Sequence, residues 1–237
     1  MVNAAVAEAC GDLAEELREE LKKTSKVDDA VFKVVRKSFK ESTPVRFEGN
    51  NYAEEWVKEA DKRVLLNLRR TPESLAQLVT KQSRKLLTSL GIFTDEEIHS
   101  RYHVRLERYI KDMLIELHTL REMVDTLVLP AAFSYADGLV AAAARAKGTG
   151  INAAPQVAQA NKVNKLIATL QKQRDAMEKV LDKAESMHDS LEKQAALLTG
   201  AGADAMAAVR AASDAIELSV ADGCWPLPKY REMLFPV

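Results

Sequence analysis

The chain has 237 residues, and its 34 lysines and arginines are balanced by 35 aspartates and glutamates, for a net charge of -1. This balance excludes the strongly basic surface that nucleic-acid binding needs, so we expect no nucleic-acid partner. No uninterrupted apolar run of about 18 residues is present, so we expect no membrane span. The start of the chain turns acidic where a signal peptide would have an apolar segment. We therefore expect a cytoplasmic protein.

The composition indicates helices throughout. Only 9 glycines and 7 prolines occur, aromatic residues make up 5% of the chain, and alanine is abundant. Sheets need more β-branched and aromatic residues and more turns. The only cysteines, Cys10 and Cys224, lie far apart, which suits a reducing compartment, although the two could pair. We predict an all-α protein.

Two helices are predicted at the N-terminal end. Residues 4–23 place apolar residues on one face: Ala5, Ala9, Leu13, Leu17 and Leu21. A second helix follows Asp28, and we expect Val31, Val35 and Phe39 to point inward. Its other side carries Lys33, Arg36, Lys37 and Lys40. We interpret this basic side as solvated surface, with phosphate binding as the alternative.

The helical pattern breaks at residues 43–56, TPVRFEGNNYAEEW, where Pro44 stops a helix and turn-forming residues follow. A short helix is predicted over residues 52–64. Thr71 and Pro72 then look like a cap and a first-turn proline, opening a helix that ends near Gly91. The sequence TDEE at residues 94–97 is a capping box that opens a much longer helix.

The centre of the chain predicts a long antiparallel coiled-coil-like hairpin within a helical bundle. Apolar residues alternate in steps of four and three from Tyr102 to Leu127, and Pro130 should kink this arm before it continues to about Lys147. After the loop KGTGINAAP a second arm repeats the pattern over residues 156–199. We expect Gly200 and Gly202 to end it, and a last helix to pack alongside.

No local motif amounts to an active site. Glu96 with His99, and Glu185 with His188, have the spacing of a di-metal bundle, but a hairpin turning near residue 151 would hold the two pairs about 20 Å apart. His99 and His103 lie one helical turn apart and could share a zinc, although surface histidines are the simpler interpretation. Arg174 and His188 fall at seam positions, where a polar residue more often fixes register.

The last residues, CWPLPKYREMLFPV, are unusually apolar for a chain end. Two prolines shortly after the final helix fix an extended path, so large side chains are presented at low entropic cost. We expect this tail to dock on the aromatic cluster near residue 50. The predicted docking residues are Phe47, Tyr52, Trp56, Trp225, Pro226, Pro228, Tyr230 and Phe235. The alternative is a partner outside this chain.

Several stretches resemble the C-terminal region of the type III glutamine synthetases. They are FEGNNYAEEWVKEADKR, NLRRTPESL, HSRYHVRLERYIKDMLIE, LPAAFSYADGL and the closing WPLPKYREMLF. The opening NAAVAEACGDLAEEL is similar to the family's helix after the catalytic core. Order and spacing agree over essentially the whole chain, so the resemblance implies a helical C-terminal domain.

The sequence departs from the family in two ways. Where the family has Lys-Arg-Gly-Leu-Pro-Asn, this chain has KRVLLN, so Val64 and Leu66 replace the glycine and the proline. We expect the turn there to be altered or destabilised. The resemblance also implies a catalytic β-sheet core that binds glutamate, ammonia, ATP and Mg or Mn, and none of its motifs is in this sequence. We therefore assign no catalytic, cofactor-binding or metal-binding residue.

Three functions follow as hypotheses. The first is the structural, oligomer-forming C-terminal part of a type III glutamine synthetase, whose partners are further copies or the catalytic core, and which alone is inactive. The second is a stand-alone helical interaction module, and the third is a helical metal binder. We expect residues 1–91 to hold a catalytic-domain helix and a small subdomain, residues 92–223 the hairpin and third helix, and residues 224–237 the docking tail.

Overall fold

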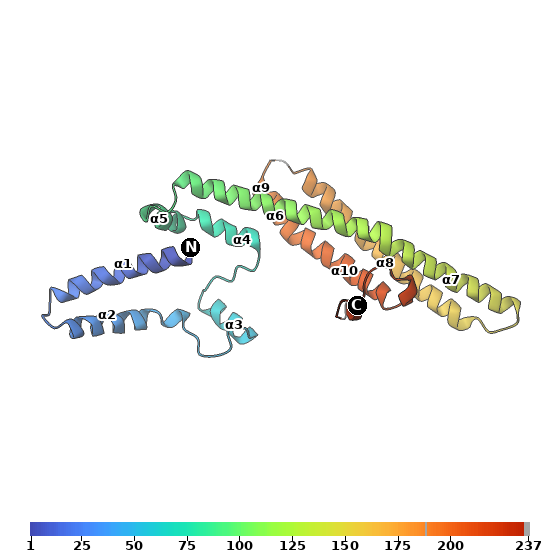
Figure 1. Cartoon of the computed structure of the whole chain (residues 1–237), viewed down its shortest axis with the longest axis horizontal. Coiled ribbons are helices and arrows are strands. Elements are labelled where there is room, and N and C mark those ends of the chain that lie inside the picture. Colours follow the sequence, from blue (N-terminus) through green and yellow to red (C-terminus); the bar gives the residue numbers. More distant parts are fainter. Residues whose placement is uncertain (188, 235–237) are drawn as a thin grey trace. The chain divides into compact units, whose positions relative to one another are not determined.

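The computed structural model describes residues 1–187 and 189–234, and the described residues form helices and turns with no β-strand. They divide into two compact units, Met1–Arg105 and Leu106–Val237, and the division falls inside one long helix. Figure 1 labels the helices in chain order. The all-α prediction is confirmed. The three functional regions expected from the sequence stay a prediction.

The first unit contains α1 (Val2–Leu21), α2 (Val27–Glu41), α3 (Glu54–Lys62), α4 (Thr71–Ala76), α5 (Lys81–Ser89) and the start of α6 (Asp95–Met123). Its small core joins Ala4, Leu86, Leu87 and Ile98. The capping box is confirmed, because the Thr94 amide donates to the Glu97 carboxylate (2.8 Å) and the Glu97 amide donates to the Thr94 hydroxyl (3.2 Å).

The helix expected over residues 71–91 is interrupted. Thr71 lies inside α4 rather than capping it, since the N-cap is Arg70. The 3-10 turn η2 (Gln77–Val79) follows, and Thr80 is extended with φ -63° and ψ 153°. Its hydroxyl accepts from the Ser83 amide (3.3 Å) and so opens α5.

The expected inward face of α2 is wrong for the described residues. Ala30 and Val34 are the buried residues of α2, whereas Val31, Val35 and Phe39 are 39%, 59% and 62% exposed. On α1, Ala4 is buried and Leu13 is 39% exposed. The helical period was identified correctly, but the apolar faces of both helices remain largely uncovered.

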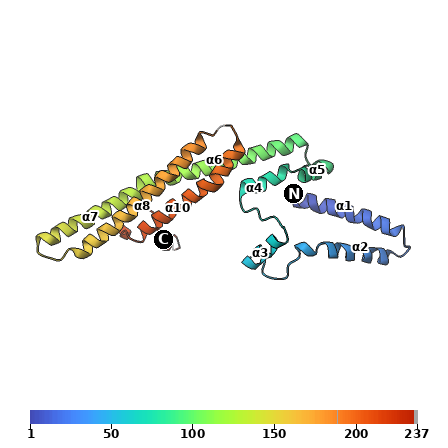
Figure 2. The ribbon, with the colours of Figure 1, turned by 180° about the vertical axis from the view of Figure 1, so that it is seen from behind.

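The second unit is a helical bundle. Its first arm is the rest of α6, the π-helical segment η3 (Val124–Val128) and α7 (Leu129–Gly148), and its second arm is α8 (Ala154–Glu185). Figures 1 and 2 show α7 and α8 side by side, with α10 (Ala203–Glu217) also packed on α8. Buried residues on α8 include Val163, Ile167, Leu170, Met177 and Leu181, as the seam predicted.

Pro130 is accommodated by a change of helix type. The Leu129 amide donates to the Val124 carbonyl five residues back, which makes one wide turn before the proline. The wider turn shifts the seam by one position, because Val128 is buried (2% exposed) whereas the predicted Leu127 is 37% exposed. A π turn therefore explains why the four-three pattern loses register at this point.

The second arm ends earlier than expected. It stops at Glu185, and the next helix, α9 (Leu191–Leu197), begins after Ser190, whose hydroxyl accepts from the Lys193 amide (3.3 Å). Gly200 and Gly202 do not break the following helix, because both lie in the π-helical segment η4 (Leu198–Gly202) that leads into α10. The predictions on His188 lie outside the described residues.

The first arm passes a length and composition test for membrane spans. Helical residues Asp95–Gly148 include an 18-residue window with mean hydropathy 1.5, of which 28% is buried. The sequence had led us to expect no such segment. A core helix of a soluble protein passes the same test when it is mostly buried, whereas most of this window is not fully buried. The part in α7 packs on α8, and Ala132 is one of its buried residues.

Candidate interaction surfaces

The aromatic cluster predicted near residue 50 is formed in part. Phe47 stacks on Trp56 with ring centroids 4.6 Å apart and planes at 29°. Gly49 allows this, because a Cβ there would meet the Phe47 ring at 2.8 Å. Tyr52 is not part of the stack and is 99% exposed.

Arg63 fixes the cluster to the chain around it. Its guanidinium lies 5.6 Å from the centroid of the Trp56 ring and donates to the carbonyls of Pro44 (3.1 Å) and Arg46 (2.8 Å). It also donates to the Glu59 carboxylate (2.9 Å). The cluster is thus held by cation–π and hydrogen-bond contacts at the end of α3.

The turn after α3 has the backbone conformation that a glycine would adopt without strain. Val64 has φ 59° and is the one non-glycine residue with positive φ among the residues described. The Val64 amide donates to the Asp61 carbonyl and the Leu65 amide to the Ala60 carbonyl, each at 2.9 Å. This is a Schellman helix end, whose left-handed position is usually glycine. The turn is therefore retained, with a β-branched residue in a strained conformation.

The tail is short and locally ordered. The 3-10 turn η5 (Asp222–Cys224) packs on α7, and α11 (Tyr230–Leu234) ends the described chain. Lys229 forms an ion pair with Asp222, and Trp225 is half-buried while Pro226 and Pro228 are exposed. Phe235 and the side chain of Tyr230 lie outside the described part. Docking of the tail on the Phe47–Trp56 cluster stays a prediction.

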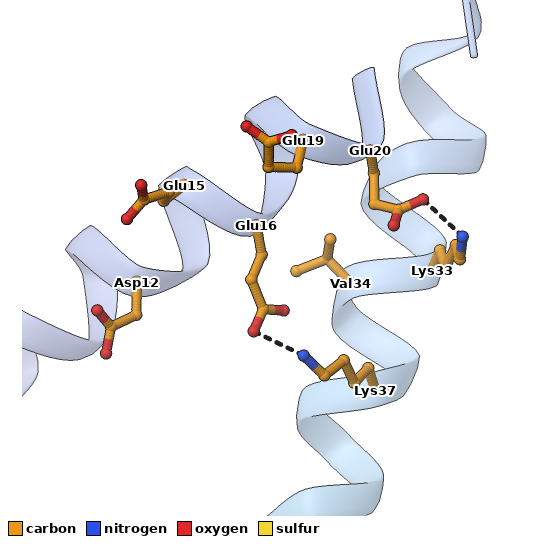
Figure 3. A pocket seen from close by; sticks show the side chains of 8 residues that line it. All are labelled: Asp12, Glu15, Glu16, Glu19, Glu20, Lys33, Val34 and Lys37. Carbon is orange, nitrogen blue, oxygen red and sulfur yellow. Dashed lines mark hydrogen bonds and ion pairs between the residues drawn. The ribbon is translucent and has the colours of Figure 1, made fainter. Parts of the chain in front are cut away.

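The α1–α2 hairpin has a charged side. Figure 3 shows acidic residues of α1 beside lysines of α2, where Glu16 reaches Lys37 (2.7 Å) and Glu20 reaches Lys33 (2.6 Å). Hydrogen bonds from Lys33, and then from Lys23, lower the pKa of Glu20. These acidic and lysine side chains line a cavity of about 870 Å³.

The other side of the same hairpin is apolar. A groove of about 420 Å³ is lined by Leu13 and Leu17 of α1 and by Val31, Val34, Val35 and Phe39 of α2, with Ser38 and Ser42 at its edge. Fully burying one side chain of this size contributes about 1.5–3 kcal/mol. Five of the six apolar residues that line the groove are partly exposed, so the groove is an apolar surface of the kind that often marks an interaction site.

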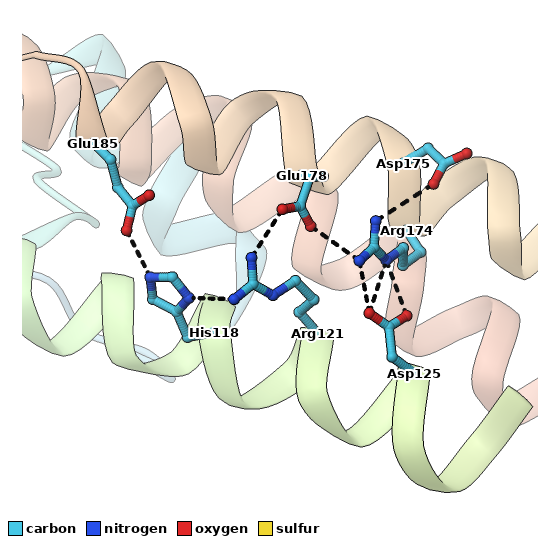
Figure 4. Close-up of polar contacts among 7 residues, drawn as sticks. All are labelled: His118, Arg121, Asp125, Arg174, Asp175, Glu178 and Glu185. Atoms are coloured by element: carbon cyan, nitrogen blue, oxygen red, sulfur yellow. Dashed lines mark hydrogen bonds and ion pairs between the residues drawn. The ribbon is translucent and has the colours of Figure 1, made fainter.

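A ladder of charged residues lies along the two arms of the second unit (Figure 4). Arg174 holds Asp125 through two nitrogens, with the shortest contact at 2.6 Å, and Arg121 donates to Glu178 (2.8 Å). The hydrogen bond to Asp125 raises the pKa of Arg174. Arg174 was expected to fix register, and it pairs across the arms.

His118 extends the ladder. Its Nε2 lies 2.7 Å from a Glu185 carboxylate oxygen, and its Nδ1 lies 3.0 Å from a guanidinium nitrogen of Arg121. The pairs 118 with 185, 121 with 178 and 125 with 174 centre near residue 150, as two arms running in opposite directions require. His118, Arg121 and Asp125 were not among the residues predicted from the sequence. Opposite charges equidistant from the loop were the signal that could have found them.

The histidine pair proposed for zinc has other neighbours. His99 Nδ1 lies 2.9 Å from the Asp95 carbonyl oxygen, and the His103 ring lies against Tyr102 at 5.5 Å. In residues 1–187 and 189–234 no group of three or more histidine, cysteine or acidic side chains could hold a metal. Both cysteines are free and exposed. The expectation that this chain binds neither ATP nor a divalent metal stays a prediction.

Comparison with known proteins identifies the family. Residues 30–147 match the model of the glutamine synthetase C-terminal domain. The chain belongs to this family. It is 28% identical to a glutamine synthetase of Bacteroides fragilis, over 99% of this chain and 33% of that protein. It is 30% identical to the type-3 glutamine synthetase of Dictyostelium discoideum, over 99% of this chain and 32% of that protein.

A third relative extends the comparison. A glutamine synthetase of Butyrivibrio fibrisolvens is 32% identical over 87% of this chain and 30% of that protein. The chain thus spans about a third of the length of the curated relatives that it matches. The resemblance drawn from the motifs is confirmed, and the chain corresponds to the helical C-terminal domain.

Proposed function

We propose that this domain braces a type III glutamine synthetase by covering its catalytic core with the apolar groove of α1 and α2. The full-length enzyme would make glutamine from glutamate, ammonia and ATP in the cytoplasm. This chain would supply packing surface and no catalytic group. Further copies of the enzyme are the second expected partner, and neither nucleic acid nor membrane is one.

One observation carries the proposal. Val35 and Phe39 are 59% and 62% exposed, and both lie within the family match. A solvated helix would place charged residues at these positions. The motif that opens the chain resembles the helix that follows the catalytic core, which would bring this groove beside the core.

The test is binding to the catalytic part of a relative. The partner is the part of the Dictyostelium type-3 enzyme that precedes the matched third, and association is measured by analytical ultracentrifugation. Val35→Glu should abolish association, because a charge would be buried in the groove. Phe32→Glu is the control, since Phe32 is 72% exposed and lines the basic side of α2 instead.

Two results would contradict the proposal. One is a lack of association with the unaltered chain, and the other is equal weakening by both variants. A stand-alone interaction module, the second candidate, is favoured by the locally ordered tail and would show self-association without binding the catalytic part. Purified chain should show no γ-glutamyl transferase activity, since phosphoryl transfer needs bound metals and the described residues include no cluster of three or more histidine, cysteine or acidic side chains to hold them.

A further inference from the structure

Two neighbouring cavities in the first unit share Leu78 and Arg105. The first has a volume of about 410 Å³, with apolar walls from Ala4, Leu78, Leu87, Ile92 and Phe93, and with Arg101 and Arg105 at its polar side. The second, of about 390 Å³, is lined by Arg69, Arg70 and Arg105, with Thr71, Ser74 and Gln77. Met1 lines both cavities. An apolar chamber therefore adjoins a group of arginines.

Two arginines of α6 lie close enough to repel each other. Arg101 and Arg105 lie one turn apart on the same helix face, where like charges repel. Glu97, one turn before Arg101, accepts from the Thr94 amide and forms no ion pair with Arg101 in the described part of the chain. The helix thus carries concentrated positive charge beside the cavity.

Three arginines that line the two cavities have guanidinium N–H donors that no described protein group accepts. Within the described chain, the side chains of Arg69 and Arg105 have no hydrogen bond or ion pair to protein groups, and the Arg101 guanidinium lies over the Phe93 ring, 4.3 Å from its centroid. A cation over a ring keeps its N–H donors available while its position is held. Guanidinium groups with free donors match carboxylate and phosphate oxygens.

We propose that this cavity binds a small anion with an apolar body. The apolar part would lie against Leu87 and Phe93, and the carboxylate or phosphate would lie between Arg101 and Arg105. A chamber of about 410 Å³ is within the range of small-molecule sites. This site is separate from the groove of α1 and α2. It would give a ligand-binding role to a domain for which the proposed function is only to pack on the catalytic core.

The experiment uses 4-phenylbutyrate and phenyl phosphate as probes, with the neutral 4-phenylbutyramide as their comparison, in calorimetric titrations of the full chain. At least one anion should bind about tenfold or more tightly than the amide, since hydrogen bonds to a charged group contribute that much. Binding of only one anion would identify the preferred head group. Arg105→Gln should remove this preference and leave amide binding unchanged.

Arg36→Gln is the matched control, because Arg36 is an exposed arginine on α2 that lines neither cavity. It should leave the affinity for the anions unchanged. The proposal is overturned if neither anion binds, if the amide binds as tightly as both anions, or if Arg36→Gln weakens binding as much as Arg105→Gln does. Circular dichroism of each variant checks that the helices are retained.

Discussion

Replacing Val64 by glycine should stabilise the first unit. Val64 ends α3 in a left-handed conformation with φ 59°, which costs a residue with a Cβ about 1–2 kcal/mol. Glycine removes that strain but adds about 0.5–1 kcal/mol of unfolded-state freedom. The valine side chain is 89% exposed, so little burial is lost. We expect a net gain of about 0.5–1 kcal/mol.

Urea unfolding followed by the fluorescence of Trp56 measures this gain. The chain has two tryptophans, so the comparison is made in a Trp225→Phe background. With an m-value of about 1–3 kcal/mol per M, the midpoint should rise by roughly 0.2–1 M. The control is Val45→Gly, at a residue that is 61% exposed and has no positive φ. It should lower the midpoint, and a similar fall for Val64→Gly would refute the strain argument.

Three further predictions concern other contacts. Arg174→Gln should lower the free energy of unfolding by about 1 kcal/mol, and a double-mutant cycle with Asp125→Asn should show coupling, whereas additive effects would mean that the pair is not formed. The hydrogen bond from Arg84 lowers the pKa of Asp95 below its ordinary value of 3.8. The pair therefore stabilises the folded state at pH values above 3.8, and this stabilisation is lost as the pH falls through the lowered pKa. Arg84→Gln should therefore destabilise near neutral pH and have little effect in strong acid, and an equal effect at both would contradict this assignment. Trp225→Ala should lower the thermal midpoint, but by less than truncation of a fully buried ring would, which costs about 3–5 kcal/mol. An unchanged midpoint together with the fluorescence of an exposed indole would place the tail's partner outside this chain.

The elements that sequence predicted well are those set by local rules. The capping box at Thr94 and the seam from Val163 to Ala184 depend on hydrogen bonds and periodicity within a few residues, and both are present. The position of the hairpin turn also followed from its glycines. The same reasoning identified Val64 as an unusual residue, and the structure shows the conformation that makes it so.

The errors come from effects that periodicity does not contain. A π turn before Pro130 shifts the seam. α8 ends at Glu185 although no glycine or proline follows there, and the Ser190 hydroxyl caps the next helix. The exposure of Val35 could not be predicted, because an apolar helix face is normally buried within its own chain. The ladder from His118 to Asp125 required the register of the arms to be known first.

The most direct test of the central claim is the genomic DNA upstream of the codon for Met1. A domain that braces a type III glutamine synthetase should be encoded in frame with the catalytic core. The account predicts an open reading frame that continues upstream into the carboxylate and arginine motifs of that core. A stop codon followed by a promoter immediately upstream would contradict it and would favour the stand-alone module.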